Sequence, residues 1–92
     1  MEKPRISVIG MGFVGLVTAT CLANKGYKVI ATTLESELVE KVNKGIAPFY
    51  EKDLDELLKS VISKGNLEAS LDNKHAVLNS EISLISVGTP ML

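Results

Sequence analysis

The feature that most constrains the fold is a glycine-rich turn placed between a strand pattern and a helix pattern. Residues 5–9 (RISVI) are short, apolar and β-branched, and residues 13–25 carry apolar and small residues at helical spacing. The turn between them, residues 10–15 (GMGFVG), has the spacing G-x-G-x-x-G. Directly after a strand and opening a helix, this spacing is typical of a Rossmann-type site for a dinucleotide.

Each glycine has its own part in such a site. Gly10 permits the tight turn out of the strand, and Gly12 has no Cβ to keep a pyrophosphate away from the backbone. Gly15 lets the helix lie close to the sheet, while free N–H groups of the first helical turn face the anion. The alternative is a tight turn that binds nothing. The residues predicted to contact the cofactor here are Gly10, Met11, Gly12, Phe13, Val14 and Gly15.

Strand and helix patterns alternate along the rest of the chain. We predict strands over 28–32, 67–71 and 82–87, a helix capped by Ser36, a helix from about residue 53, and a short helix within 72–80. Lys-Gly pairs end the first three helices, where glycine suits the cap. The prediction is an α/β class: a partial, doubly wound Rossmann fold in one domain over 1–92, with four parallel strands ordered 3-2-1-4 and helices on both faces.

Composition excludes several classes of function. Ten basic and 11 acidic residues give a net charge of −1, with a single arginine and no basic stripe, which argues against nucleic acid as a partner. No apolar run reaches the ~18–20 residues that cross a membrane, and the first residues do not resemble a secretion signal. We therefore expect no membrane partner and a cytoplasmic location.

Three groups of reactive side chains are interpreted as structural. Cys21, the only cysteine, excludes a disulfide or a cysteine-based zinc site, and we expect a buried thiol on the first helix. His75 follows polar residues and is predicted to be a solvated turn residue. The acids at 53, 55 and 56 suit a helix N-terminus. We predict no catalytic residue and no metal site.

The ribose end of the predicted site departs from the usual pattern. A Rossmann domain that prefers NAD has an acidic residue at the end of its second strand, a place that falls here at Thr33. Glu35, the nearest acid, lies two residues further on. A hydroxyl in place of a carboxylate should cost on the order of 1–2 kcal/mol, about tenfold in affinity. No arginine stands nearby to receive a 2′-phosphate, so we expect weak NAD binding and no support for NADP.

Three stretches resemble the UDP-glucose/GDP-mannose dehydrogenase family: residues 6–19 (ISVIGMGFVGLVTA), 43–51 (NKGIAPFYE) and 86–90 (SVGTP). The resemblance implies NAD as cofactor and a family reaction that oxidises a nucleotide sugar to its uronic acid. It also implies that Val87, Gly88 and Thr89 contribute to the cofactor site, and that Tyr50 lies in a substrate loop. Thr33 and Leu38 depart from the family pattern, since they stand in place of an aspartate and a basic residue.

The resemblance leaves two functions open. The family's catalytic cysteine, central helix and sugar-nucleotide domain belong to a later part that these residues do not match. We therefore expect the N-terminal NAD-binding portion of such a dehydrogenase, inactive alone, with a separate catalytic chain as a candidate partner. The alternative is a non-catalytic binding or interaction module, a degenerate relic of the family. A hydroxyacyl-CoA type of Rossmann dehydrogenase is disfavoured by the last two stretches. The apolar fourth strand would be an open sheet edge, which predicts a homodimer.

Overall fold

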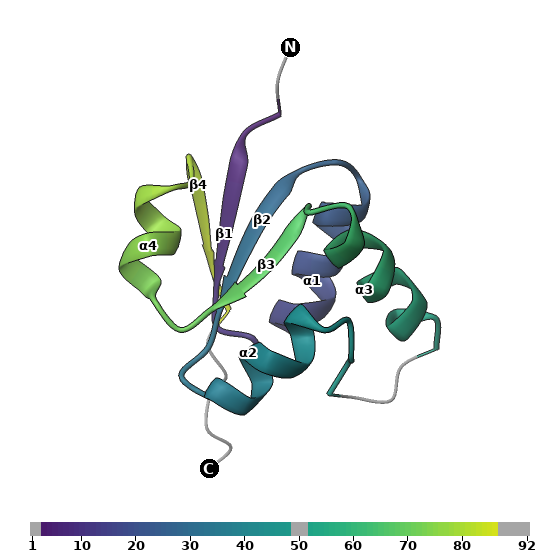
Figure 1. The fold of residues 1–92 in the computed structure, drawn as a ribbon. Helices are drawn as coiled ribbons and strands as arrows, with labels where there is room; N and C mark the ends of the chain where they lie inside the picture. Colours follow the sequence, from purple (N-terminus) through teal and green to yellow (C-terminus); the bar gives the residue numbers. More distant parts are fainter. Residues whose placement is uncertain (1–2, 49–51, 87–92) are drawn as a thin grey trace.

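The computed structural model describes residues 3–48 and 52–86, which form a parallel sheet with helices on both faces (Figure 1). The strands are ordered β3-β2-β1-β4, which confirms the predicted α/β class and strand order. The elements are β1 (Arg5–Ile9), α1 (Phe13–Asn24), β2 (Lys28–Thr32), α2 (Ser36–Asn43), α3 (Leu54–Ser63), β3 (Leu67–Ser70), α4 (Asn73–Leu78) and β4 (Ile82–Ile85).

The two faces of the sheet differ in chemistry because side chains alternate along each strand. The face covered by α1 and α3 is apolar, and its buried strand residues pack against Leu16 and Leu58 of those helices. The opposite face carries α4 and is more polar. There the buried Ser7 hydroxyl lies 2.7 Å from the Ser83 hydroxyl and accepts a hydrogen bond of 2.9 Å from Ser80. These serines tie β1 to β4 and to the end of α4.

The glycines predicted to end the first three helices do so in the structure, whereas the predicted N-cap of α2 is one residue too late. Gly26, Gly45 and Gly65, which follow α1, α2 and α3, all have positive φ, as the Lys-Gly pairs predict. The prediction of Ser36 as an N-cap was wrong, since Glu35 caps α2 and Ser36 is its first helical residue. The physical reason is a turn closed one residue earlier, in which the Glu35 N–H donates to the Thr33 hydroxyl at 3.3 Å.

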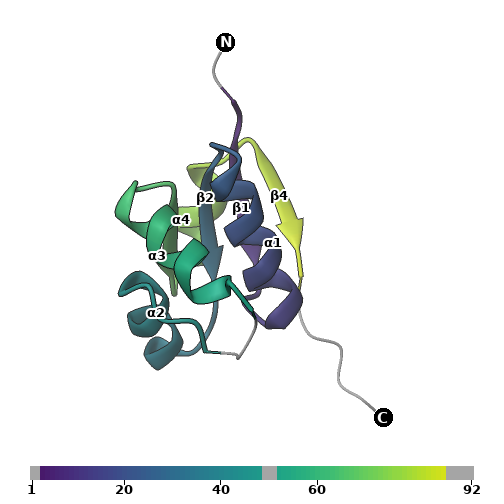
Figure 2. The same cartoon turned by 90° about the vertical axis from the view of Figure 1, so that its right-hand side faces the viewer.

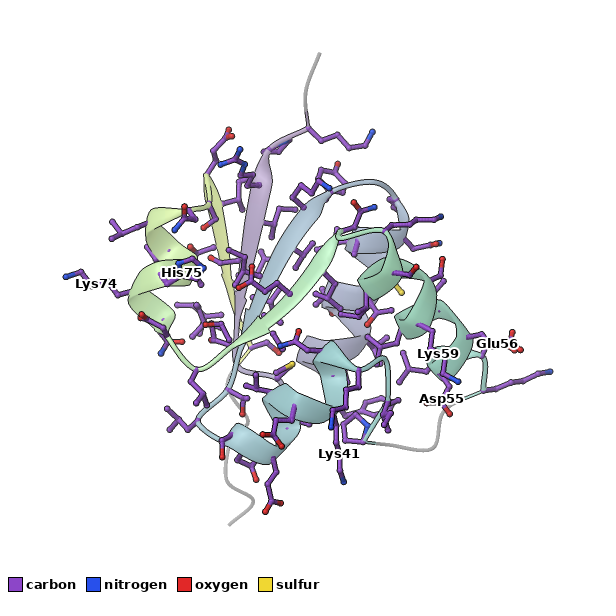
Figure 3. The ribbon with its side chains drawn as sticks, in the orientation of Figure 1. Lys41, Asp55, Glu56, Lys59, Lys74 and His75 are labelled. Atoms are coloured by element: carbon purple, nitrogen blue, oxygen red, sulfur yellow. The ribbon has the colours of Figure 1, made fainter. Side chains whose placement is uncertain are left out.

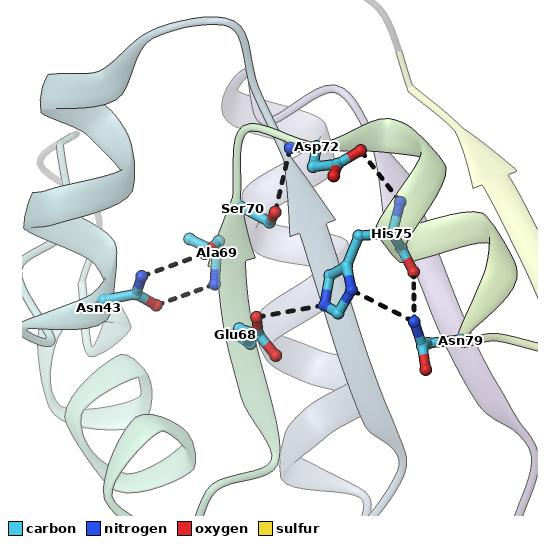
Figure 4. Close-up of polar contacts among 7 residues, drawn as sticks. All are labelled: Asn43, Glu68, Ala69, Ser70, Asp72, His75 and Asn79. Carbon is cyan, nitrogen blue, oxygen red and sulfur yellow. Dashed lines mark hydrogen bonds and ion pairs between the residues drawn. The ribbon is translucent and has the colours of Figure 1, made fainter.

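The third strand ends at Ser70, one residue before its predicted end. The Asp72 N–H donates to the Ser70 hydroxyl at 3.0 Å and turns the chain away from the sheet (Figure 4). The Asp72 carboxylate then accepts a hydrogen bond of 3.0 Å from the His75 N–H and caps α4. His75 thus lies in the first turn of a helix, and the predicted short helix within 72–80 is present.

The two edges of the sheet are treated differently. At β3 the Asn43 side chain donates to the Ala69 carbonyl at 3.1 Å and accepts from the Ala69 N–H at 2.8 Å (Figure 4). At the other edge, β4 pairs only with β1 within the described chain, and Figure 2 shows it at the margin of the sheet. Every residue of β4 is exposed. One edge is therefore occupied by a side chain and the other is open.

Candidate cofactor site

The glycine turn lies at the carboxyl edge of the sheet, between β1 and α1. The Gly10 N–H donates to the Thr32 carbonyl at 3.0 Å, and this bond ties the start of the turn to the end of β2. Gly12 is the N-cap of α1 and is exposed, and no atom of residues 3–48 or 52–86 lies within 4 Å of the place a Cβ would take. The first hydrogen bond within α1 runs from the Leu16 N–H to the Gly12 carbonyl at 2.9 Å. The start of the helix therefore faces space that the described residues do not fill.

Gly15 has a different environment from Gly12. It is buried, and a Cβ there would overlap the Gly10 carbonyl oxygen and lie 3.2 Å from the Ser86 hydroxyl. Only a residue without a side chain lets α1 approach the turn this closely. The two glycines thus have separate roles, since Gly12 leaves room for a ligand and Gly15 allows the helix to pack.

The other three residues of the turn are divided between core and surface. The Met11 side chain is 3% exposed and belongs to the core, so only its backbone can face a ligand. Phe13 and Val14 are 47% and 67% exposed at the start of α1. We expect these three residues to contribute to a ligand site chiefly through their backbone.

Two hollows meet at the glycine turn. The larger, of about 420 Å³, lies over the ends of β1 and β2 and is lined by Thr32, Thr33, Glu35 and Asn73 as well as the turn. The smaller, of about 290 Å³, lies toward α2, between Gly12, Pro48 and the side of that helix. Its α2 residues are Glu37, Leu38 and Lys41. The glycine turn therefore has a concave surface on each side.

Thr33, the residue predicted to meet the ribose, lies on the wall of the larger hollow. Its N–H donates to the Ser70 carbonyl at 3.1 Å, and its hydroxyl accepts the bond from Glu35. The residue before it was missed by the sequence analysis. The Thr32 hydroxyl is buried and has no hydrogen-bond partner within the described part of the chain, although Thr32 lines this hollow. The sequence shows two adjacent threonines, Thr32 and Thr33, at the end of β2. It does not show which of the two hydroxyl groups will lack a hydrogen-bond partner.

The other residues assigned to the site by resemblance are placed only in part. Leu38 lies on the wall of the smaller hollow, at the family's basic position. Tyr50, Val87, Gly88 and Thr89 lie outside the described residues. Ser86, just before them, donates from its N–H to the Ile9 carbonyl at 2.8 Å, which carries the chain toward the carboxyl edge beside the glycine turn.

Cys21, His75 and the acids of α3 lie away from the two hollows. The prediction of a buried Cys21 was wrong: its side chain is exposed, in a shallow apolar groove between α1 and α3. A helix that is apolar on several sides gives no clear inner face, which explains the error. Within residues 3–48 and 52–86, no group of three or more acids, histidines or cysteines could hold a metal ion. In the same ranges, no helix is long and apolar enough to cross a membrane.

His75 has its own polar surroundings on the α4 side of the sheet. Its Nε2 lies 3.6 Å from a Glu68 carboxylate oxygen, and its Nδ1 lies 3.2 Å from the Asn79 amide nitrogen (Figure 4). Figure 3 shows His75 across the sheet from Asp55 and Glu56 of α3. Asp55 accepts a hydrogen bond of 3.1 Å from the Ala47 N–H, so it has a structural role in holding the loop after α2.

A parallel sheet ordered 3-2-1-4, with an open glycine turn at its carboxyl edge, defines a Rossmann-type dinucleotide-binding domain. Comparison with known families gives the particular one. The chain belongs to the UDP-glucose/GDP-mannose dehydrogenase family, whose NAD binding domain matches residues 4–92.

Individual relatives agree with this family. The chain is 42% identical over 86 residues to GDP-mannose 6-dehydrogenase of Pseudomonas aeruginosa, covering 94% of this chain and 20% of that protein. It is 38% identical over 87 residues to UDP-N-acetyl-D-mannosamine dehydrogenase of Pyrococcus horikoshii, covering 95% and 21%. The chain spans about a fifth of the length of these relatives.

Solved structures share the fold closely. A ternary complex of the Pseudomonas aeruginosa GDP-mannose dehydrogenase superposes with a TM-score of 0.91 at 42% identity, over 94% of this chain and 20% of that one. A UDP-glucose dehydrogenase from Pyrobaculum islandicum gives 0.92 at 32% identity, over 97% and 21%. The partial Rossmann fold is therefore the N-terminal fold of nucleotide-sugar dehydrogenases.

Proposed function

We propose that the chain binds NAD at the glycine turn and supplies the cofactor part of a nucleotide-sugar dehydrogenase. The observation that carries the proposal is the open space at Gly12, beside the start of α1. Backbone N–H groups at a helix start attract a pyrophosphate, and a residue without Cβ lets it approach. Gly10 to Gly15 would hold the pyrophosphate through the backbone.

The larger hollow fits the adenosine half of such a ligand. It extends from the turn to Asn73 along the ends of β1 and β2, and Thr32 and Thr33 are among its lining residues. Lys41 is the one cation among the residues that line the two hollows. With no arginine to pair a 2′-phosphate, this lining favours NAD over NADP. With Thr33 and Leu38 at the adenosine side, the affinity should be low.

When bound, NAD would supply a hydride acceptor, while the chain's own residues would bind and orient it. Neither hollow contains a cysteine, because Cys21 lies in the separate groove between α1 and α3. We therefore expect no NADH from the 92-residue chain with UDP-glucose or GDP-mannose. Oxidation would then need further residues, for which a separate catalytic chain is the candidate partner.

Calorimetric titration with NAD at millimolar concentration tests the proposal. The original chain should release or absorb measurable heat, and Gly12→Val should abolish the signal because its side chain occupies the pyrophosphate space. Circular dichroism should show the variant folded, since a Cβ at Gly12 meets no atom of the described residues within 4 Å. Absence of binding by the original chain would overturn the proposal.

The second candidate function is a non-catalytic interaction module. The observation in its favour is β4, whose four residues are all exposed and mostly apolar. An open apolar strand can pair with another strand, which would give a homodimer. If the chain associates through β4 and binds no dinucleotide, the module is the better description.

A further inference from the structure

We propose that Glu35, and not Thr33, accepts the hydrogen bond from the adenosine ribose and thereby selects NAD over NADP. This inference rests on the proposed cofactor function. It assigns the ribose contact to a residue two positions beyond the usual place at the end of β2.

The first argument is position. Glu35, Met11 and Gly12 are the residues that line both hollows at the glycine turn. The Met11 side chain is buried in the core and Gly12 has none. Among residues 3–48 and 52–86, Glu35 therefore supplies the only polar side chain that lines both hollows. A dinucleotide with its pyrophosphate at Gly12 must place its adenosine ribose close to this junction.

The second argument is that the Glu35 carboxylate is uncommitted. Glu35 is the N-cap of α2, yet its side chain makes no capping hydrogen bond. Its carboxylate also makes no ion pair or other hydrogen bond to residues 3–48 or 52–86. An exposed carboxylate at a hollow, with no partner among the described residues, can accept a hydrogen bond from a ligand hydroxyl.

The third argument is that the Thr33 hydroxyl holds the Glu35 backbone and, being neutral, is a weaker acceptor for a ligand hydroxyl than a carboxylate. This hydroxyl accepts the Glu35 N–H at 3.3 Å, and the Thr33 N–H is bonded to Ser70. This short turn holds the Glu35 backbone against the end of β2. Thr33 therefore acts as a positioning residue. The strand end has no carboxylate of its own, and Glu35, two residues later, supplies one.

The fourth argument is charge, which decides between the two cofactors. A carboxylate accepts from a 2′-hydroxyl in a charge-assisted bond but repels a 2′-phosphate. Glu37 adds a second negative charge on the smaller hollow, against the single positive charge of Lys41. Glu35 thus discriminates by direct contact, whereas Glu37 acts only through the general field.

The experiment measures dissociation constants of the 92-residue chain for NAD, NADP and an NAD analogue with a 2′-deoxyadenosine ribose. The variants are Glu35→Gln and its matched control Glu37→Gln, which removes the same charge two residues further along the chain. In Glu35→Gln, NAD should bind about fivefold more weakly because a neutral acceptor replaces a charged one. NADP should bind more tightly, so that the ratio of the two constants falls at least about tenfold. Glu37→Gln should change that ratio less than about threefold.

The deoxy analogue tests the contact without relying on a variant's folding. Removing the 2′-hydroxyl should weaken binding to the original chain and should weaken binding to Glu35→Gln by a smaller factor, because the glutamine keeps only a neutral acceptor. Equal binding of NAD and its deoxy analogue by the original chain would overturn the inference, as would equal effects of the two glutamine variants. Either result would leave the proposed NAD site standing. By contrast, an original chain that binds no NAD overturns the proposed function, and the inference with it.

Discussion

Replacing Gly15 with alanine should destabilise the fold, even though alanine is the better helix former. The added Cβ would overlap the Gly10 carbonyl oxygen, which is backbone and cannot rotate away. Hydrogen bonds from Gly10 to Thr32 at 3.0 Å and from Ser86 to Ile9 at 2.8 Å hold this part of the backbone on both sides. The start of α1 must therefore move off the sheet to make room.

The magnitude follows from two opposing terms. Forcing a methyl group into a packed site costs about 1–3 kcal/mol, and a rigid backbone neighbour puts Gly15 at the upper end of that range. Helix propensity returns about 1 kcal/mol for a glycine-to-alanine change. The net loss should be about 2 kcal/mol, which corresponds to a fall in Tm of about 8–16 °C for a domain of this size.

Urea and thermal unfolding, followed by circular dichroism, measure the change. Gly12→Ser is the matched control, because a Cβ there contacts nothing within 4 Å and serine is a preferred N-cap. We expect the control to keep or slightly raise the free energy of unfolding. If Gly15→Ala unfolds within about 0.5 kcal/mol of the original chain, the close approach of α1 to the turn is not what requires glycine.

Three further predictions test the core and the sheet edges. Leu58→Ala should lower the free energy of unfolding by about 2–5 kcal/mol in urea titration, because Leu58 is fully buried against the sheet. Asn43→Ala should lower it by about 1–2 kcal/mol by removing both hydrogen bonds to Ala69, and an unchanged urea midpoint would contradict that role. Sedimentation at tens of micromolar should show a dimer that Leu84→Lys in β4 converts to a monomer; a monomeric original chain would refute association through β4.

The strand order could be predicted from the sequence because the strand patterns, the helix patterns and the glycine turn all indicate the same alternation of strands and helices. Residues 5–9 and 28–32 became β1 and β2 with the predicted bounds, and the helices between strands forced parallel pairing. The spacing of the glycine turn was informative for the same reason. Gly15 is required by a backbone contact, which is a local property of the strand–turn–helix unit.

Features that depend on side-chain direction could not be predicted. Cys21 lies on a helix that is apolar almost all round, so spacing alone does not show which side faces the sheet. Glu35 lies three residues after the end of β2, and the sequence alone gives no sign that the chain there turns back toward the glycine turn. The turn closed by Thr33 brings Glu35 to the wall of both hollows, and that turn depends on one side chain-to-backbone bond.

The amide of Asn43 also determines how the sheet can grow. It occupies the N–H and the carbonyl of Ala69 on the outer edge of β3, so within the described residues β4 is the sheet edge left open to another strand. A molecule with one such place can pair once and is then closed, as in a two-fold dimer. A molecule with two would add copies at both ends without limit and form fibres. If copies of this chain do pair through β4, Asn43 should limit that pairing to one edge of each sheet, so that a dimer and not a fibre results.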